Sequence, residues 1–244
     1  MYSVDPTTTA GSCSLVGSTV TFTNVGTCVI DINQPGDSTY APAPQVQKLI
    51  TIGAVAPSVK VALSISSARF GQIARATASI TVASGVVAGA VQFSVDGKAL
   101  GSAQPVVNGV ATSPALIGAN GRPLVPGAHR IGAVFTPSDS VMYMAVSATA
   151  SHSVRKAGTK LSLVVHPKTI TATVLTVAPG VALASGTVTF KVSGKVVGRA
   201  MLHNRVATLK YVLKKGQSKF VTAIYGGNAN LLGSSSARAI VKSR

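Results

Sequence analysis

Acidic residues, which many hydrolytic enzymes need in pairs, are scarce in this chain of 244 residues. It contains no glutamate, and all five of its acidic residues are aspartates. Hydrolysis of a glycosidic bond requires two neighbouring carboxyl groups, and Asp96 and Asp139 are the only two acids between positions 57 and 156. Both stand in turn-like sequences, where aspartate commonly bonds to its own backbone. We therefore expect no catalytic pair and assign no catalytic residue.

Histidines do not suggest a metal site either. His129, His152, His166 and His203 lack the short spacings of metal ligands, and we expect them to be solvated or half-buried strand residues. The glycine-rich stretch 118–127 is followed by no helix that could hold a phosphate. No G-x-S-x-G nucleophile sequence occurs. The sequence therefore predicts no metal, no cofactor and no enzymatic activity.

The two cysteines, Cys13 and Cys28, each follow a glycine-containing turn signal. Residues 14–27 between them read as turn, strand and turn, which would place the cysteines on non-consecutive strands of a small sheet. A disulfide is one interpretation and would require an oxidising compartment. Two small buried thiols are the alternative, whereas a zinc site would need more ligands.

Charge is distributed unevenly along a chain whose net charge is +17. Residues 1–56 carry net −2, residues 57–156 carry net +6, and residues 157–244 carry thirteen bases and no acid. Such a one-sided field attracts polyanions, for example anionic cell-wall polymers, acidic glycans, nucleic acids or anionic lipid surfaces. A basic exterior also keeps a valine-rich β protein soluble and discourages edge-to-edge pairing. Both interpretations are open at this point.

If the last segment binds an acidic polymer, its lysines and arginines would make the contacts. The densest basic stretch is Lys214 and Lys215 with Lys219, in a predicted loop. Nucleic acid is the weaker candidate, because few aromatic side chains there could stack on bases and some of these must lie in the core. The candidate polyanion contacts are Lys191, Lys195, Arg199, Arg205, Lys210, Lys214, Lys215 and Lys219.

The strand pattern that would carry several of these residues occurs twice in the sequence. GAVQFSVDGKALGSA (89–103) returns 97 positions later as GTVTFKVSGKVVGRA (186–200), with eight of 15 positions identical. Self-similarity over such a long period indicates a repeated module. Each copy alternates apolar and polar residues around Phe93 or Phe190, as in a half-buried strand. Asp96-Gly97 and Ser193-Gly194 then predict a hairpin turn.

A second repeated pattern is HRIGAVF (129–135) and FVTAIY (220–225). Further strand-like runs lie at 59–65, 77–82, 161–165 and 171–177, and no helical period is convincing. Many short strands separated by glycine and proline favour antiparallel sandwiches, and a repeat of 90–100 residues has the size of an immunoglobulin-type sandwich. Tryptophan is absent, so we expect valine-rich cores with Phe93 and Phe190 as aromatic anchors.

Two uncharged stretches, 76–95 and 169–190, are long enough to cross a bilayer. Because they are rich in Gly, Ser and Thr and occupy equivalent positions of the repeat, we interpret them as buried hairpins and expect no membrane span. The first residues do not resemble a signal peptide. The protein either stays inside the cell or is a piece of a longer exported one.

We therefore divide the chain into a partial module (1–56) and two complete modules (57–156 and 157–244), joined by short linkers. The quoted motifs, with VATL (206–209) and FVTAIYGGNANLLGSSSA (220–237), resemble the bacterial Ig-like repeat. Residues 2–52 resemble the closing half of a related module of actinobacterial surface proteins, with the cysteine pair kept. The family's usual Asp is Ser193 here, and its usual Tyr is replaced by Leu231-Leu232.

This resemblance implies an all-β fold of tandem immunoglobulin-like β-sandwiches, the first of them truncated. It also implies a non-catalytic spacer and adhesion-type segment of an exported cell-surface protein. Two alternatives are a module that binds a cell-wall polymer or acidic glycan through the basic 157–244 segment, and an accessory region of a larger exported enzyme. The sequence does not indicate an oligomeric state.

Overall fold

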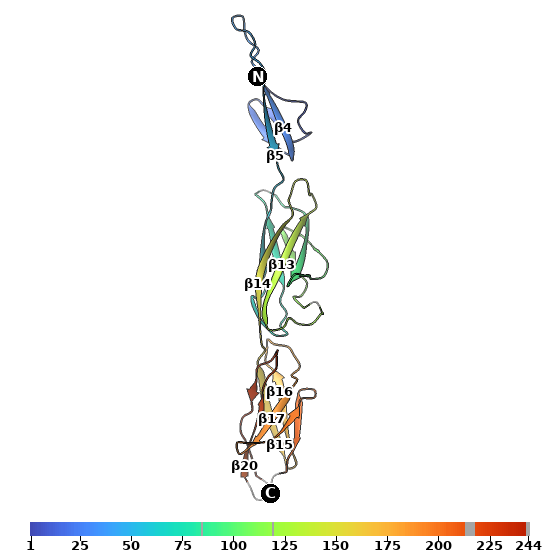
Figure 1. The fold of residues 1–244 in the computed structure, drawn as a ribbon, viewed down its shortest axis with the longest axis vertical. Coiled ribbons are helices and arrows are strands. Elements are labelled where there is room, and N and C mark those ends of the chain that lie inside the picture. The colour runs from blue at the N-terminus through green and yellow to red at the C-terminus, as the bar shows by residue number, and fades with distance from the viewer. Residues whose placement is uncertain (84, 119, 213–217, 243–244) are drawn as a thin grey trace.

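The computed structural model of the chain describes residues 1–83, 85–118, 120–212 and 218–242. In these residues the regular elements are β-strands, and no helix has the length and hydropathy needed to cross a membrane. Three groups of strands follow one another along the long axis of the molecule (Figure 1). We call them the N-terminal unit (β1–β5), the middle unit (β6–β14) and the last unit (β15–β22).

The middle unit is a sandwich of two sheets. One sheet has the order β10-β9-β13-β14-β7, with β11 also paired to β9, and the other has the order β12-β8-β6. All pairs are antiparallel except that of β7 with β14. The strands are β6 (Ser58–Leu63), β7 (Ser67–Arg69), β8 (Ala76–Thr81), β9 (Gly89–Val95), β10 (Lys98–Ala99), β11 (Gln104–Pro105), β12 (Val110–Thr112), β13 (Gly127–Pro137) and β14 (Val146–Arg155).

The last unit repeats this design. One sheet has the order β15-β16-β19, and the other has the order β18-β17-β20-β21, with β22 also paired to β20. A β-bulge interrupts the pairing of β17 with β18. The strands are β15 (Thr159–His166), β16 (Thr169–Thr176), β17 (Thr187–Val192), β18 (Lys195–Met201), β19 (Val206–Lys210), β20 (Ser218–Tyr225), β21 (Ser234–Ser235) and β22 (Ala239–Lys242).

Equivalent residues fill the two cores, as the alternation predicts. Phe93 and Phe190 are both completely buried, one in each core. Phe135 of the middle unit and Tyr225 of the last unit occupy the second aromatic position. Burying side chains of this size stabilises a fold by about 2–3 kcal/mol each. The all-β tandem fold and both aromatic anchors are therefore confirmed.

The hairpin turns also have the predicted conformation. Asp96 and Gly97 have φ values of 50° and 80°, and Ser193 and Gly194 have 46° and 83°. Two successive residues with positive φ match the right-handed twist of the strands that they connect.

The N-terminal unit is much smaller. It consists of a three-stranded sheet, β1-β4-β5, and a hairpin of β2 and β3. Its buried side chains are few and centre on Cys28, Val29 and Ile30. The strands are β1 (Tyr2–Val4), β2 (Cys13–Val16), β3 (Thr19–Phe22), β4 (Gly26–Ile32) and β5 (Val46–Ile52). The two-stranded sheet of this hairpin is the only other sheet within residues 1–52.

The same backbone clamp recurs where the chain enters each sandwich. Val55 bonds to Met142 and Met144 of the middle unit, at 2.8 and 2.9 Å. Ala157 likewise bonds to Asn230 and Leu232 of the last unit, at 3.0 and 2.9 Å. Each clamp is a short parallel bridge between the incoming chain and a loop of the sandwich.

Candidate functional site

The described cations of the last unit lie mainly on one sheet and at one end. Alternate residues of a strand face opposite sides of its sheet, so Lys191, between buried Phe190 and Val192, faces outward. Arg199 of β18 pairs with Thr189 of β17. Thr189 faces the same side as Lys191, so Arg199 lies on that outer face as well. The sheet of β18, β17 and β20 thus carries cations on the side away from the core.

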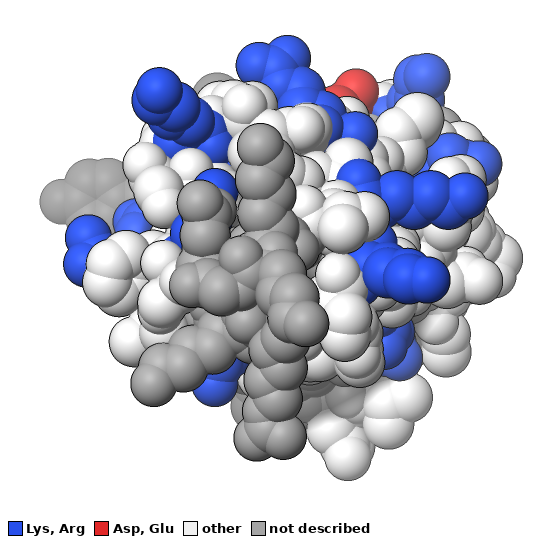
Figure 2. All heavy atoms as spheres, turned by 90° about the horizontal axis from the view of Figure 1, so that it is seen from below, with Lys and Arg blue, Asp and Glu red and all other residues white. Residues whose placement is uncertain are grey.

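Lys195, Lys210 and Lys219 gather at the end of the sandwich that points away from the middle unit. β18 begins at Lys195, β19 ends at Lys210 and β20 begins at Ser218, so all three stand at the same edge of the two sheets. Seen from this end, lysines and arginines project around the rim of the molecule (Figure 2). Lys214 and Lys215, the densest part of the predicted patch, lie outside the described residues.

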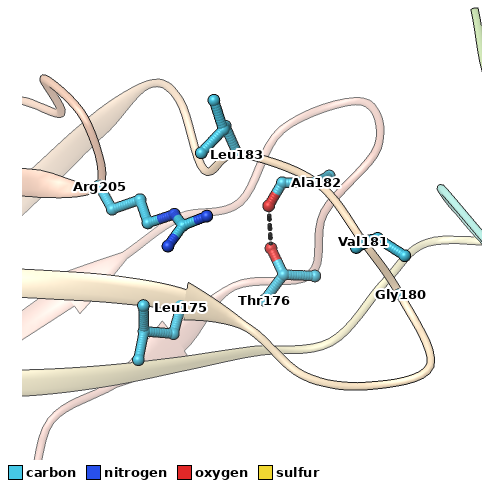
Figure 3. A pocket seen from close by; sticks show the side chains of 7 residues that line it. All are labelled: Leu175, Thr176, Gly180, Val181, Ala182, Leu183 and Arg205. Carbon is cyan, nitrogen blue, oxygen red and sulfur yellow. Dashed lines mark hydrogen bonds between the residues drawn. The ribbon is translucent and has the colours of Figure 1, made fainter.

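Arg205 is separate from this group. It precedes β19 at the opposite end of the sandwich, and its guanidinium borders a hollow of about 260 Å³. Figure 3 shows the hollow, closed on one side by a hydrogen bond of 2.6 Å from the Thr176 hydroxyl to the Ala182 carbonyl. The predicted contacts therefore do not form one patch: a distal group and the outer face of one sheet stand apart from Arg205.

The outer face of this sheet also carries apolar side chains, which the sequence pattern did not predict. Val196, Met201, Phe220 and Ile240 are all at least 47% exposed. The guanidinium of Arg238 lies 5.2 Å from the centre of the Phe220 ring, a cation–π contact. Phe220 is hence a surface residue. It precedes buried Val221 and therefore faces the opposite side of the strand.

A disulfide joins Cys13 of β2 to Cys28 of β4, with an S–S distance of 2.01 Å. The two strands are not consecutive, because β3 lies between them in the chain. The disulfide, one of the two interpretations of the sequence, is therefore confirmed over the alternative of two buried thiols. It attaches the β2–β3 hairpin to the central strand of the N-terminal sheet.

His129 and Asp96 form an ion pair in the middle unit. His129 Nδ1 lies 2.7 Å from Asp96 Oδ2, and Nε2 lies 2.8 Å from the Val125 carbonyl oxygen. Both ring nitrogens face acceptors, and only the protonated imidazole has two donors. Burial alone lowers the pKa of His129, but these hydrogen bonds and the Asp96 charge raise it overall. The His129 hydrogen bond is the main cause that lowers the pKa of Asp96.

The expectation that all four histidines are solvated or half-buried is wrong for two of them. His129 is 8% exposed and His152, its partner across β13 and β14, is 2% exposed. Burial lowers the pKa of His152, and its Nδ1 has no hydrogen-bond partner among the described residues. Sequence spacing could not reveal this pair, since the strand register brings the two rings together. His166 and His203 are exposed.

Asp139 is a loop-building residue. Its Oδ1 accepts hydrogen bonds from the backbone N–H groups of Val141 and Met142, at 3.0 and 2.9 Å. Asn228 accepts the equivalent pair in the last unit. Asp96 and Asp139 lie beyond opposite ends of β9, roughly 20 Å apart at the usual rise per strand residue. They cannot act on one glycosidic bond. Among the described residues, no three His, Cys, Asp or Glu side chains converge as a metal site.

Comparison with known proteins identifies one segment. Residues 156–242 match the family model described as "Bacterial Ig-like domain (group 3)". No curated protein matches the sequence.

Several solved structures are similar over most of the chain. Fibronectin(III)-like modules of CbhA from Clostridium thermocellum match with 20% identity and a TM-score of 0.30, over 76% of this chain and 95% of theirs. A Ca²⁺-stabilised, ice-binding adhesin of an Antarctic bacterium matches with 13% identity and a TM-score of 0.34, over 90% of this chain and 56% of its own. β-Glucuronidase 3 of Bacteroides uniformis matches with 13% identity and a TM-score of 0.28, over 77% of this chain and 25% of its own.

Proposed function

We propose, from the premise that residues 156–242 form a bacterial Ig-like domain, that this chain is a non-catalytic spacer segment of an exported cell-surface protein with an adhesion-type role. The observation that carries the proposal is the joint between the middle and last units. Phe70 is packed against both hydrophobic cores at once. A side chain shared by two cores fixes one sandwich relative to the next, as a spacer of defined length requires.

Other contacts of the joint support the same reading. Arg69 donates a hydrogen bond from Nη1 to the Lys156 carbonyl oxygen, at 3.2 Å. Lys156 Nζ donates to the Asn228 carbonyl oxygen, at 2.8 Å. Gly71 lies so close to the Val181 carbonyl that a Cβ atom would collide with it. Because inter-domain motion is the default where contacts are sparse, these contacts favour a stiff joint.

Export is supported by the disulfide, since such bonds persist in oxidising compartments. We further propose that residues 1–56, 57–156 and 157–244 are separate modules, the first of them a partial sandwich. The alternative is an accessory region of a larger exported enzyme. Such a region would also need a fixed spacing between its domains. The sequence encoded on either side of this chain distinguishes the two.

The spacer proposal is tested by measuring residual dipolar couplings of the full chain in a weakly aligning medium. One alignment tensor should describe the amides of both the middle and last units. Phe70→Ala should require two different tensors, while each unit keeps its own spectrum. Val107→Ala, at an exposed loop residue of the middle unit, is the matched control. Two tensors in the unaltered protein would refute a fixed spacer.

A second candidate function, binding of an anionic wall polymer or acidic glycan, is favoured by the charge of the last unit. Residues 157–244 contain thirteen bases and no acid, and lysines and arginines project around the end of the molecule that is seen in Figure 2. Binding to polyanions is driven largely by counterion release and so weakens steeply with salt.

The test uses poly(glycerol phosphate) and hyaluronate as probes, titrated into the full chain at about 20 and 200 mM salt, a range over which phosphate contacts lose much of their affinity. The double variant Lys195→Gln and Lys210→Gln should bind both polymers severalfold more weakly. Lys98→Gln, which changes the lysine at the repeat position equivalent to Lys195, should have little effect. Absence of binding at low salt would eliminate this candidate.

A further inference from the structure

The outer face of the larger sheet of the middle unit contains a hollow of about 430 Å³. Three strands cross beneath it, and the row Ser94–Gly132–Thr149 runs across β9, β13 and β14 in direct register. Neighbouring strands lie about 4.8 Å apart, so Ser94 and Thr149 stand roughly 10 Å apart with only a glycine between them. This distance joins the two backbones; the Ser94 hydroxyl leans toward Gly132 from one side of the gap, and Thr149 borders the other.

Gly132 creates the hollow. A Cβ atom at this position would lie 2.5 Å from Ser94 Oγ, so any larger residue would displace that hydroxyl and occupy the space. Gly132 has no left-handed backbone conformation that would itself require glycine. Val134, which is 47% exposed, supplies an apolar surface beside the glycine. The floor is therefore open and mildly apolar.

The rim is polar. The hydroxyls of Ser94, Ser147 and Thr149 border the hollow together with Arg130 and Asp96. Asp96 is 51% exposed, and each of its oxygens accepts one bond from the protein, which leaves lone pairs for a ligand. Arg130 presents a fork of N–H donors. Because Asp96 is already paired with the protonated His129, Arg130 leaves this rim with at most one net positive charge, far less than the last unit carries, which favours a hydrogen-bonding ligand over a polyanion.

The last unit does not keep this hollow, although it repeats the core. In β17 and β20 the residues paired like Ser94 and Gly132 are Lys191 and Thr222. Phe220 takes the place of Arg130, because Ser193 N–H bonds to the Phe220 carbonyl as Asp96 N–H bonds to that of Arg130. Two side chains thus fill the position that Gly132 leaves free. The hollow belongs to the middle unit and not to the repeat as such.

We propose that this hollow binds a neutral saccharide, with one sugar ring lying over Gly132 between Ser94 and Thr149. The ring's C–H face would rest against Gly132 and Val134, and its hydroxyls would bond to Arg130, Asp96 and the rim hydroxyls. An extended peptide is disfavoured, because the backbone groups of these central strands are already paired within the sheet. The site lies outside the last unit and does not depend on its basic charge.

The proposal is tested by titrating the ¹⁵N-labelled full chain with three neutral hexasaccharides: β-1,4-linked glucose, β-1,4-linked N-acetylglucosamine and α-1,4-linked glucose. At least one should shift the amide signals of Ser94, Gly132 and Thr149, with a Kd in the millimolar range expected for a shallow polar site. Gly132→Thr, which introduces the residue that the last unit carries there, should weaken binding at least tenfold. Arg130→Gln should weaken it severalfold without filling the floor.

Thr222→Gly in the last unit is the matched control and should leave the titration unchanged. Unaltered signals from buried Phe93 and Ile131 would show that Gly132→Thr still folds. The proposal fails if no hexasaccharide at 10 mM shifts the row, or if the shifts survive Gly132→Thr. It also fails if only hyaluronate shifts these signals, since the site would then select charge.

Discussion

His129 Nδ1 and Asp96 Oδ2 lie 2.7 Å apart, joining the first hairpin turn of the middle unit to the start of its longest strand. Asp96 also accepts a hydrogen bond of 2.9 Å from the Arg130 backbone N–H. One carboxylate therefore holds the turn and the strand together. The raised pKa of His129 and the lowered pKa of Asp96 both have this contact among their causes.

Asp96→Asn should destabilise the middle unit more at pH 5.5 than at pH 8. The pKa of His129 is raised above its ordinary 6.5, so the stability that it contributes is complete below that value and is lost as pH rises through the folded-state pKa. Because Asp96 is half exposed, we expect a difference of about 0.5–1 kcal/mol. Urea unfolding of the full chain, followed through the amide signals of β9 and β13, measures it.

Acidification also affects His152, because burial lowers the pKa of this histidine. That histidine costs stability as pH falls in both the unaltered protein and the Asp96→Asn variant. The charge of His129 also contributes to the lowered pKa of His152, so comparing the two proteins removes only the part of this cost that comes from burial. An equal effect of Asp96→Asn at both pH values would show that the pair is not charged in the folded protein.

Ser193→Asp should stabilise the last unit. Ser193 has the backbone conformation of Asp96, with φ values of 46° and 50°, and Lys219 precedes Phe220 as His129 precedes Arg130. An aspartate at 193 would face a partly buried lysine, a contact worth about 0.5–1 kcal/mol. Urea unfolding followed through β20 signals should show the gain at low salt and its decrease at 1 M salt. Ser193→Asn is the control; an equal gain from asparagine would mean that the turn, not the charge, is responsible.

Gly71→Ala should disturb the joint between the middle and last units, whereas Gly97→Ala should not. The two glycines have nearly the same φ, +83° and +80°, so alanine costs about 1–2 kcal/mol of backbone strain at either position. Only at Gly71 would the new methyl group also collide with the Val181 carbonyl, since nothing lies near Gly97. Residual dipolar couplings should show reoriented units for Gly71→Ala alone. Reorientation by both variants would assign the effect to strain in the middle unit.

Replacing both Cys13 and Cys28 with serine should loosen the N-terminal unit. The disulfide closes a separation of 15 residues, which corresponds to about 3 kcal/mol in the chain-entropy account. We expect limited proteolysis to cut first within residues 1–52 in the variant, and at the same sites in the unaltered protein after reduction. Earliest cuts of the variant within the last unit would contradict the expectation that losing the disulfide weakens the N-terminal unit most.

Alternation and repetition were sufficient to predict both cores. Phe93 and Phe190 could be placed from the sequence because each lies at the centre of an apolar–polar alternation that ends in a tight turn. Hydrophobic burial requires the apolar residues of that alternation to face the core, so the pattern determines which side chains are buried. Local turn signals likewise indicated that Cys13 and Cys28 lie on non-consecutive strands, which made a disulfide one of two open interpretations.

Contacts between strands that are far apart in the sequence were harder to predict. Asp96 and His129 are 33 residues apart, and nothing in either local sequence specifies the register that joins them. Phe70 belongs to two cores and therefore to no single alternation. The split of the predicted basic patch has a similar cause: Arg205 and Lys210 are near neighbours in sequence, but β19 carries them to opposite ends of the sandwich. The hollow over Gly132 depends on three strands meeting.

The parallel pairing of β7 with β14 has a mechanical consequence. The chain enters the middle unit along β6, continues directly into β7 and leaves the unit at the end of β14, so tension applied to the two ends would load β7 and β14 lengthwise past each other. Their hydrogen bonds would be loaded in shear and all at once, and would have to break together. The bridges of Val55 to Tyr143 and of Ala157 to Leu231 have the same parallel sense, so each entry point resists tearing in the same manner.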